Sequence, residues 1–423
     1  MATRYWKGDA QAVSQVLTLT VGGTIEADDL FKITIGSKTL TVTAGSTSAA
    51  AVAGNIVAAF NALDSRLYPE FTGSTSGAAA AVTTGGSLTL TAKKEGVPIA
   101  VTLAVTEADG SPPDAQTFTQ STTVANSGPN DWSTAANWDG GVLPAGGDDV
   151  VIQNSNVDIL YGLDQSGVTL ASLTIKQNYT GKIGLPRTNS AGYAEYREAY
   201  LKISATSVNI GEGEGAGSGR IKLNTGSNAT TVNVFNTGTT AEPGVKAILW
   251  RGAHASNVVN VNKGSFAAAP FAGETATIAT LRQGYRTNQT GDTDVLLGAG
   301  CTLTTLNKSG GALEVNSSFT TLTQGAGETV LQAGTPSTVH LNGGQLRWRS
   351  GSGATTVNVS DGAELDFRQD MRAKTIATLN LYAKAIVRDP FEVATITSGY
   401  VLQKCDIADV TLDIGTDITL VRS

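Results

Sequence analysis

At 423 residues the chain is long enough for two or three domains, and its 49 glycines without a collagen period are typical of turn-rich β structure. The formal net charge of −7 argues against a nucleic-acid partner, because no cationic surplus is available to neutralise phosphates. Residues 1–7 contain no apolar signal-peptide core and no run of about 18 apolar residues exists, so we also expect no membrane partner.

Residues 1–122 are expected to form a small α+β domain. Alternating apolar and polar residues predict strands at 16–21, 30–35, 40–43, 87–92 and 99–105. A helix is predicted over residues 48–63 from apolar side chains at helical spacing, which are Val52, Ile56, Ala59, Phe60 and Leu63. Residues 73–86 are low in complexity and are expected to be a loop.

Residues 123–150 are expected to hold the end of a linker and the cap of a repetitive rod. The linker, over residues 108–130, is rich in Ser, Pro, Thr and Asp. An open end of a repeat stack exposes core and strand edges, so bulky side chains must cover it. We expect Trp132 and Trp138 to form this structural cap.

Residues 151–389 are expected to form a single-stranded parallel β-helix, which makes the whole chain mainly β. Short β-type runs return roughly every 18–27 residues, a period of repeat architectures. One family comprises residues 232–234, 259–261 and 357–359, and a second comprises 313–315, 346–348 and 365–367. The steps from Val339 to Val357 and from Leu346 to Leu365 are about one coil each. Insertions are expected at 185–200 and 262–275, and residues 390–423 are expected to be a terminal cap or an oligomerisation segment.

Glu364 and Asp366 are the first candidates for chemistry. Leu365 and Phe367 should point inward, which places both acids on the outer face about 7 Å apart, a separation suited to an acid/base pair. One coil earlier, Arg347 and its outward neighbour Arg349 should stack beside them. A cross-strand ladder of ion pairs is therefore the stronger interpretation.

The remaining polar candidates indicate no cofactor and no metal. Glu212 and Glu214 lie in a Gly-rich stretch that matches no calcium loop, and a flexible turn is favoured there. His254 and His340 are isolated from other ligand residues. For Cys301 and Cys405, two buried free thiols are favoured over a disulfide.

Three tyrosines in the first insertion are candidate binding residues. Tyr193, Tyr196 and Tyr200 lie there among arginines and glutamates. Exposed Tyr and Arg are typical anchors for protein contacts or for sugar stacking. Covering the side of the rod is an equally supported role for them.

Two stretches resemble segments of structural proteins from bacteriophages and prophages. The first is the opening Tyr5-Trp6-Lys7-Gly8-Asp9-Ala10, with Gly23-Thr24-Ile25-Glu26-Ala27-Asp28-Asp29 after it. A strand–hairpin–Ala-rich-helix module of this style is similar to ones in head and tail proteins of tailed phages. The second is similar to a motif that opens β-helical regions in bacterial and phage surface proteins, and reads Asn137-Trp138-Asp139-Gly140-Gly141-Val142-Leu143-Pro144.

This resemblance implies a virion component, assembled in the host cytoplasm and displayed outside the particle, with residues 1–122 as its docking domain. It carries over no catalytic residue. Within that class we favour a non-enzymatic capsid decoration protein that contacts the major capsid protein or another virion protein and is a homotrimer by analogy. The alternative is a tail fibre or tailspike adhesin that binds or cleaves host polysaccharide, using Glu364 and Asp366. A bacterial surface adhesin is disfavoured by the missing signal.

Overall fold

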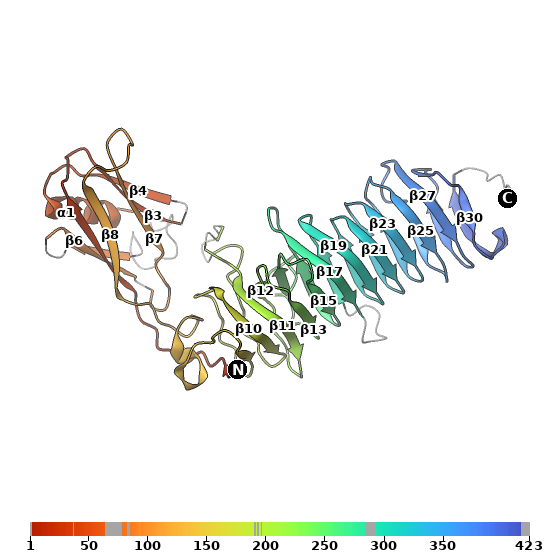
Figure 1. Cartoon of the computed structure of the whole chain (residues 1–423), viewed down its shortest axis with the longest axis horizontal. Helices are drawn as coiled ribbons and strands as arrows, with labels where there is room; N and C mark the ends of the chain where they lie inside the picture. Colours follow the sequence, from red (N-terminus) through yellow and green to blue (C-terminus); the bar gives the residue numbers. More distant parts are fainter. Residues whose placement is uncertain are drawn as a thin grey trace.

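The computed structural model describes residues 2–415, except for residues 37, 64–77, 83–84, 93, 190–191, 193, 196 and 285–292. Strand accounts for 48 % and helix for 6 % of the chain, which confirms a mainly β protein. Figure 1 shows a small N-terminal module next to a long stack of parallel strands. Within the described residues, no helix has the length and apolar character needed to cross a membrane.

The N-terminal module contains two antiparallel sheets and one helix. The first sheet has the order β5-β6-β2-β8, with β5 (Ala78–Val82), β6 (Ser87–Ala92), β2 (Val16–Gly23) and β8 (Gln116–Val124). The second has the order β4-β3-β7, with β4 (Lys38–Thr43), β3 (Leu30–Ile35) and β7 (Val101–Thr106). Phe31 and Phe118 join the sheets through an edge-to-face contact with ring centroids 5.5 Å apart.

Helix α1 (Ala49–Asn61) forms where the apolar spacing predicts it. Its buried face consists of Val52, Ala53, Ile56 and Phe60, which lie three or four residues apart and pack into the core shared with the sheets. The alanines between them have the highest intrinsic helix propensity, so the local sequence and the packing favour the same structure.

Three strands of the structure lie where the sequence predicts other features. Strand β5 lies inside the stretch 73–86 that was expected to be a loop. Strand β8 lies inside the expected linker, and it pairs with β2 over nearly its whole length. Strand β1 (Thr3–Tyr5) pairs with β9 (Asp149–Ile152) of the parallel stack, although residues 1–122 were assigned to the N-terminal domain.

The module is therefore an insertion between β1 and the rest of the stack. Val13 and Ser127, at the two ends of this insertion, form an antiparallel bridge, and the Val13 N–H donates to the Ser127 carbonyl at 2.8 Å. The chain leaves the stack after β1, builds the module and returns beside its point of departure. Figure 1 shows the N terminus at the foot of the stack, near β10.

The parallel strands form two rows. The first row continues from β9 with β10 (Asp164–Lys176), β11 (Leu201–Glu212), β13 (Thr231–Val234), β15 (Val258–Val261), β17 (Ala276–Gln283), β19 (Cys301–Lys308), β21 (Phe319–Gln324), β23 (Pro336–Leu341), β25 (Ala354–Val359), β27 (Lys374–Leu381), β29 (Ala394–Ile396) and β30 (Tyr400–Leu402). The second row contains β12 (Ile221–Asn224), β14 (Ile248–Arg251), β16 (Gly264–Ala268), β18 (Thr293–Leu297), β20 (Ala312–Val315), β22 (Glu328–Leu331), β24 (Gln345–Trp348), β26 (Glu364–Asp366), β28 (Ile386–Asp389) and β31 (Thr411–Ile414). From β11 on, each strand hydrogen-bonds in parallel to its counterpart in the next repeat.

The register of this pairing confirms the periodicity in the sequence. Val339 is the partner of Val357, and Leu346 is the partner of Leu365, as the predicted step of one coil requires. The two families of runs lie in different rows: residues 357–359 belong to the first row and residues 365–367 begin in the second. The long parallel sheet is compatible with a β-helix or solenoid.

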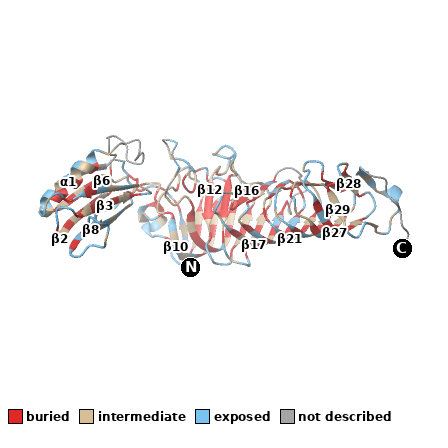
Figure 2. Ribbon diagram, turned by 90° about the horizontal axis from the view of Figure 1, so that it is seen from above, coloured by how far each residue is buried: buried red, intermediate tan, exposed pale blue. Residues whose placement is uncertain are grey.

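One continuous apolar core fills the stack. The buried cluster extends from Trp6 at the N-terminal end to Val393 near the C-terminal end, and Figure 2 shows buried residues along the whole interior. Parallel pairing also continues past residue 389, since β29 and β30 pair with β27 and β31 pairs with β28. The segment expected to be a cap therefore extends the stack, and β16 likewise makes a regular strand of residues inside the second expected insertion.

Candidate functional site

The N-terminal end of the stack is closed by three tryptophans. Trp132 and Trp138, which the sequence places at this end, are both buried, and their ring centroids lie 4.6 Å apart. Trp6 from the chain start packs edge-on against Trp138 at 5.2 Å. The Trp138 indole N–H donates to the Trp132 carbonyl at 2.9 Å. These rings cover the first coil, whose core would otherwise contact water.

Asn137 holds the returning chain against this cap. Its side chain is fully buried, and its amide donates to the carbonyls of Gly128 and Asp131, each at 2.8 Å. Its side-chain oxygen accepts the Ala10 N–H at 2.8 Å, and its backbone carbonyl accepts the Lys7 N–H. One residue therefore ties the segment before the module to the segment after it, which fixes where the module leaves the stack.

Glu364 and Asp366 belong to a ladder of ion pairs that extends over five strands of the second row, from β22 to β31. Arg347 is the register partner of Asp366 in the preceding coil, and Arg388 is its partner in the next. The ladder comprises the ion pairs Arg347–Glu328 at 2.8 Å, Arg368–Asp366 at 3.0 Å, Arg388–Glu364 at 2.8 Å and Arg388–Asp413 at 3.6 Å. The stacking of Arg347 beside the acids agrees with the ladder interpretation, whereas Arg349 instead bonds Gln369.

Asp366 is held in its ionised form and is covered by protein. Only 2 % of its side chain is exposed, because Arg368 folds back over it with two guanidinium hydrogen bonds of 3.0 Å each. Burial alone raises the pKa of Asp366, but the hydrogen bonds from the Arg368 side chain and backbone outweigh it, and the pKa lies below its ordinary value. A carboxylate of this kind is a poor proton donor at neutral pH.

Replacing Asp366 by asparagine is expected to lower the free energy of unfolding by about 1–2 kcal/mol at pH 7, since a buried charge-assisted bidentate contact is lost. Because the folded-state pKa is depressed, this contribution exists above the ordinary pKa of 3.8 and disappears as pH falls further below it. Urea unfolding should therefore show a difference in the free energy of unfolding between wild type and Asp366→Asn that is smaller at pH 3 than at pH 7. Asp413→Asn, which changes an acid with 45 % side-chain exposure, is the matched control and should have little effect. Equal stabilities of wild type and Asp366→Asn at pH 7 would contradict the account.

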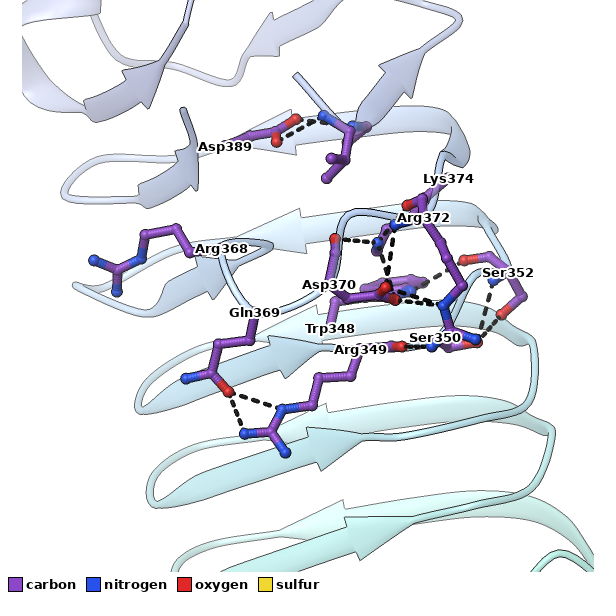
Figure 3. Close-up of polar contacts among 12 residues, drawn as sticks. Trp348, Arg349, Ser350, Ser352, Arg368, Gln369, Asp370, Arg372, Lys374 and Asp389 are labelled. Carbon is purple, nitrogen blue, oxygen red and sulfur yellow. Dashed lines mark hydrogen bonds and ion pairs between the residues drawn. The ribbon is translucent and has the colours of Figure 1, made fainter. Parts of the chain in front are cut away.

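Polar contacts also fasten the loop between β26 and β27 to the preceding coil (Figure 3). Arg349 donates to the Gln369 amide oxygen, and Arg372 donates to the Arg349 carbonyl. The amine of Lys374 is buried and donates to the carbonyls of Asp370 and Arg372 at 3.1 and 2.7 Å. The loop is thus held in place by hydrogen bonds from its own side chains and from the preceding coil.

Of the three tyrosines proposed for binding, only Tyr200 lies among the described residues; Tyr193 and Tyr196 lie outside them. Tyr200 is 4 % exposed, so the expectation of an exposed anchor is wrong for it. The Arg251 guanidinium lies 3.7 Å from its ring centroid, and Arg251 also pairs with Glu198 at 3.3 Å. Tyr200 packs with Leu249 and Ala267 on the outside of β14 and β16. It covers the side of the stack, which was the second interpretation.

The other polar candidates take structural positions. Glu212 pairs with Lys176 in the neighbouring strand. His340 bonds Asn358 in the next coil, and the ring of His254 accepts the Ser256 N–H at 3.0 Å. Cys301 and Cys405 are both free thiols, the first buried and the second half-buried. The favoured interpretation of the cysteines is confirmed, except that Cys405 is only partly covered.

A group of carboxylates in the N-terminal module escaped the sequence analysis. One oxygen each of Glu26, Asp29 and Glu107 lie within 4.8 Å of one another, and the Gln116 amide donates to Asp29 and to Glu107. Carboxylate oxygens are ligands of hard cations. Glu107 lies far from Glu26 in the sequence, so only the pairing of β3 with β7 and of β2 with β8 brings these side chains together.

Glu26→Gln is expected to raise the melting temperature of the N-terminal module by a few degrees at pH 7. Repulsion from Asp114, Glu107 and other nearby acids raises the pKa of Glu26, so the ionised form is disfavoured in the folded state. A raised pKa means that stability is lost as pH rises through it, and the gain should vanish near pH 4. Calorimetry at both pH values measures this. Glu95→Gln, at an exposed acid outside the group, should change neither melting temperature.

A column of polar side chains inside the apolar core was likewise not predicted from the sequence. Gln283, Lys308 and Gln324 are register partners in β17, β19 and β21, at a position that is apolar in the flanking coils. The Gln324 amide nitrogen lies 3.2 Å from the carbonyl oxygens of residues 327, 343 and 345, which share its two N–H donors. The Lys308 amine donates to the Ala326 carbonyl at 3.1 Å, and burial lowers its pKa to about 7. The glycine-rich turns after these strands are the sequence signal, since they leave room for long polar side chains.

No protein-family model matches the chain. No curated protein matches it either. Its function must therefore be inferred from the geometry of the chain itself.

Proposed function

We propose that the protein is a non-enzymatic structural component of a bacteriophage particle, and most specifically a capsid decoration protein on the particle exterior. In this proposal the two rows of parallel strands form a single β-helical rod. The N-terminal module docks onto the major capsid protein or another virion protein. The chain assembles in the host cytoplasm and is a homotrimer on the particle.

The continuity of the stack is the observation that carries the proposal. Parallel pairing extends without interruption from β1 to β31 over one apolar core. A stack of this kind opens locally only at a high cost, because every coil hydrogen-bonds to its neighbours and covers their apolar faces. Such rigidity suits a spacer or a surface element that must survive outside a cell.

The way in which the module joins the rod supports a docking role. The module is attached through both ends of its chain, at β1 and at residues 127–138, and the buried Asn137 holds both ends. A load on the module is therefore passed to the first coils of the rod through paired strands. A single flexible linker would not transmit force or orientation in this way.

The alternative is a tail fibre or tailspike adhesin. This alternative requires a surface on the rod that binds host polysaccharide. Cleavage by Glu364 and Asp366 does not fit the structure, because arginines occupy both acids and Asp366 is buried. If the protein were such a depolymerase, reducing sugar would be released from host polysaccharide and Asp366→Asn would abolish the release.

Immuno-electron microscopy of phage particles from a lysate of the host tests the proposal, with an antibody against the rod and a pre-immune serum as control. Regular label over the head is expected for a decoration protein. Label confined to the tail would move the assignment to a fibre or spike. Particles that carry no label, although the protein is present in the lysate, would overturn the assignment to the virion.

A further inference from the structure

A shallow groove of about 530 Å³ lies on the outer face of the last coils. It extends across β23, β25, β27 and β30, whose spacing of about 4.8 Å per strand makes it roughly 14 Å long. These strands lie at the end of the rod that is farthest from the N-terminal module (Figure 1). The side chains that line it include those of His340, Asn358, Asp361, Tyr382, Gln403 and Lys404.

A chain of hydrogen bonds fixes the polar floor of the groove. Asn358 Nδ2 lies 3.0 Å from His340 Nδ1, Asn380 Nδ2 donates to Asn358 Oδ1 at 2.8 Å, and Gln403 Nε2 donates to Asn380 Oδ1 at 3.0 Å. The bond from Asn380 identifies the Asn358 oxygen, so the Asn358 amide group must donate to the imidazole. His340 Nδ1 therefore accepts, and its ring hydrogen is on Nε2.

Each of these side-chain amides keeps hydrogen-bonding capacity for a ligand. An amide offers two N–H donors and an oxygen with two lone pairs, and the hydrogen bonds between the amides use only some of these donors and lone pairs. Because the side chains are already ordered by one another, a ligand that bonds to them would lose little additional side-chain entropy. The floor is thus a preorganised row of uncharged donors and acceptors.

The rim of the groove supplies an aromatic ring and unusual turns. Tyr382 is 38 % exposed, so part of its ring is open to solvent. Asp361, in the turn after β25, and Lys404, in the turn after β30, adopt positive φ angles of 52° and 57°, a conformation that costs a non-glycine residue about 1 kcal/mol or more. Such strain is concentrated at functional sites. Among the described residues, the Asp361 carboxylate has no hydrogen-bond or ion-pair partner, which leaves its oxygens available to a ligand.

The chemistry of the groove selects one class of ligand. A nucleic acid requires excess positive charge, whereas the groove lining contains one lysine, Lys404, one acid, Asp361, and one imidazole. An extended peptide would need an unpaired strand edge, but the backbone here is consumed by pairing between coils. A ligand with many hydroxyl groups and flat C–H faces satisfies both the ordered amides and the tyrosine ring.

We propose that this groove binds an oligosaccharide, with the Tyr382 ring stacked on one sugar and Asn358, Asp361 and Gln403 bonding its hydroxyl groups. This adds a binding activity to the proposed structural role and does not depend on that role. A rod that docks by its N-terminal module would hold the groove away from the particle.

Binding of the fluorescently labelled full-length protein to an array of bacterial polysaccharide fragments, covering neutral hexoses, deoxy sugars, amino sugars and uronic acids, is the first measurement. We expect selective binding to one subset. Tyr382→Ala should weaken it about tenfold or more, and Asp361→Asn should weaken it severalfold. Tyr5→Ala is the matched control, since Tyr5 is 40 % exposed at the opposite end of the rod, and it should leave binding unchanged.

A second measurement covers sugars absent from the array. Fluorotyrosine is incorporated into the full-length protein, the resonance of Tyr382 is identified with Tyr382→Phe, and monosaccharides of each class are titrated at high millimolar concentration. The Tyr382 resonance is expected to shift while that of Tyr5 remains in place. No array binding together with no shift overturns the proposal, as does binding that survives Tyr382→Ala in a variant with an unchanged melting temperature. Antibody label on particles carrying Tyr382→Ala should persist, which separates failure of this site from failure of the virion assignment.

Discussion

Replacing Trp138 by alanine is expected to lower the free energy of unfolding of the rod by about 3–5 kcal/mol, the cost of deleting a large buried aromatic side chain. The ring contacts both Trp6 and Trp132, and its N–H satisfies the Trp132 carbonyl. Its loss leaves a cavity between two remaining rings and an unbonded carbonyl. Since Trp6 follows directly after β1, the pairing of β1 with β9 should loosen as well.

Urea unfolding measures the first effect, and hydrogen exchange of residues 3–8 measures the second. Trp348→Ala is a control for location: it removes an equally buried ring from β24, far from the cap, and should destabilise without faster exchange at β1. Val142→Ala, at a 46 % exposed position close to the cap, should change neither quantity. A loss of less than about 1 kcal/mol for Trp138→Ala would show that the three rings do not act as a cap.

The free energy of unfolding is expected to rise between pH 7 and pH 10. Lys308 alone should contribute on the order of 4 kcal/mol to this rise. The pKa of Lys308 is lowered by burial to about 7, against an ordinary value of 10.5. Between these values the unfolded chain binds a proton that the folded chain does not, so stability increases with pH. Each unit of difference in pKa corresponds to about 1.4 kcal/mol.

Lys308→Met isolates this contribution, because methionine keeps the apolar stem and removes the titrating amine. The free energy of unfolding of the wild type should rise relative to that of Lys308→Met as pH rises from 7 to 10. The difference between the two proteins should therefore narrow or reverse. Lys374→Met is a useful comparison, since burial also lowers the pKa of Lys374. Measurements stay below pH 10, because burial raises the pKa of Tyr200 and its titration has the opposite sign above that range. A difference that is constant with pH would show that the Lys308 amine is charged throughout.

The local periodicity of the sequence was sufficient to predict the stack of parallel strands. Alternation with a buried position every second residue identifies strands, and the recurrence of Val-Asn-Val and Leu-x-Val runs identifies which strands are equivalent. The partnership of Val339 with Val357 and the inward positions of Leu365 and Phe367 both follow from this pattern. Helix α1 was predictable for the same reason, because its apolar residues recur at helical spacing within one short segment.

The features that the sequence did not predict depend on contacts between distant residues. Strand β8 has the composition of a linker, and only the free edge of β2 makes it a strand. Strand β1 has three residues and no periodic signal, yet β9 offers it an edge at the end of the rod. The groove floor, the acid group and the Lys308 column likewise join residues from several coils or from opposite ends of a module.

The sequence by itself thus determined the repeat, the direction in which apolar side chains point and the helical face of the small module, because these follow from hydrophobic burial with a fixed local period. The tertiary structure alone decided that Asp366 and Tyr200 are buried and paired, while Tyr382 and Asp361 remain open to solvent. Burial of a polar side chain depends on which distant segment covers it and on whether that segment supplies a partner. Neither condition is encoded in a local pattern.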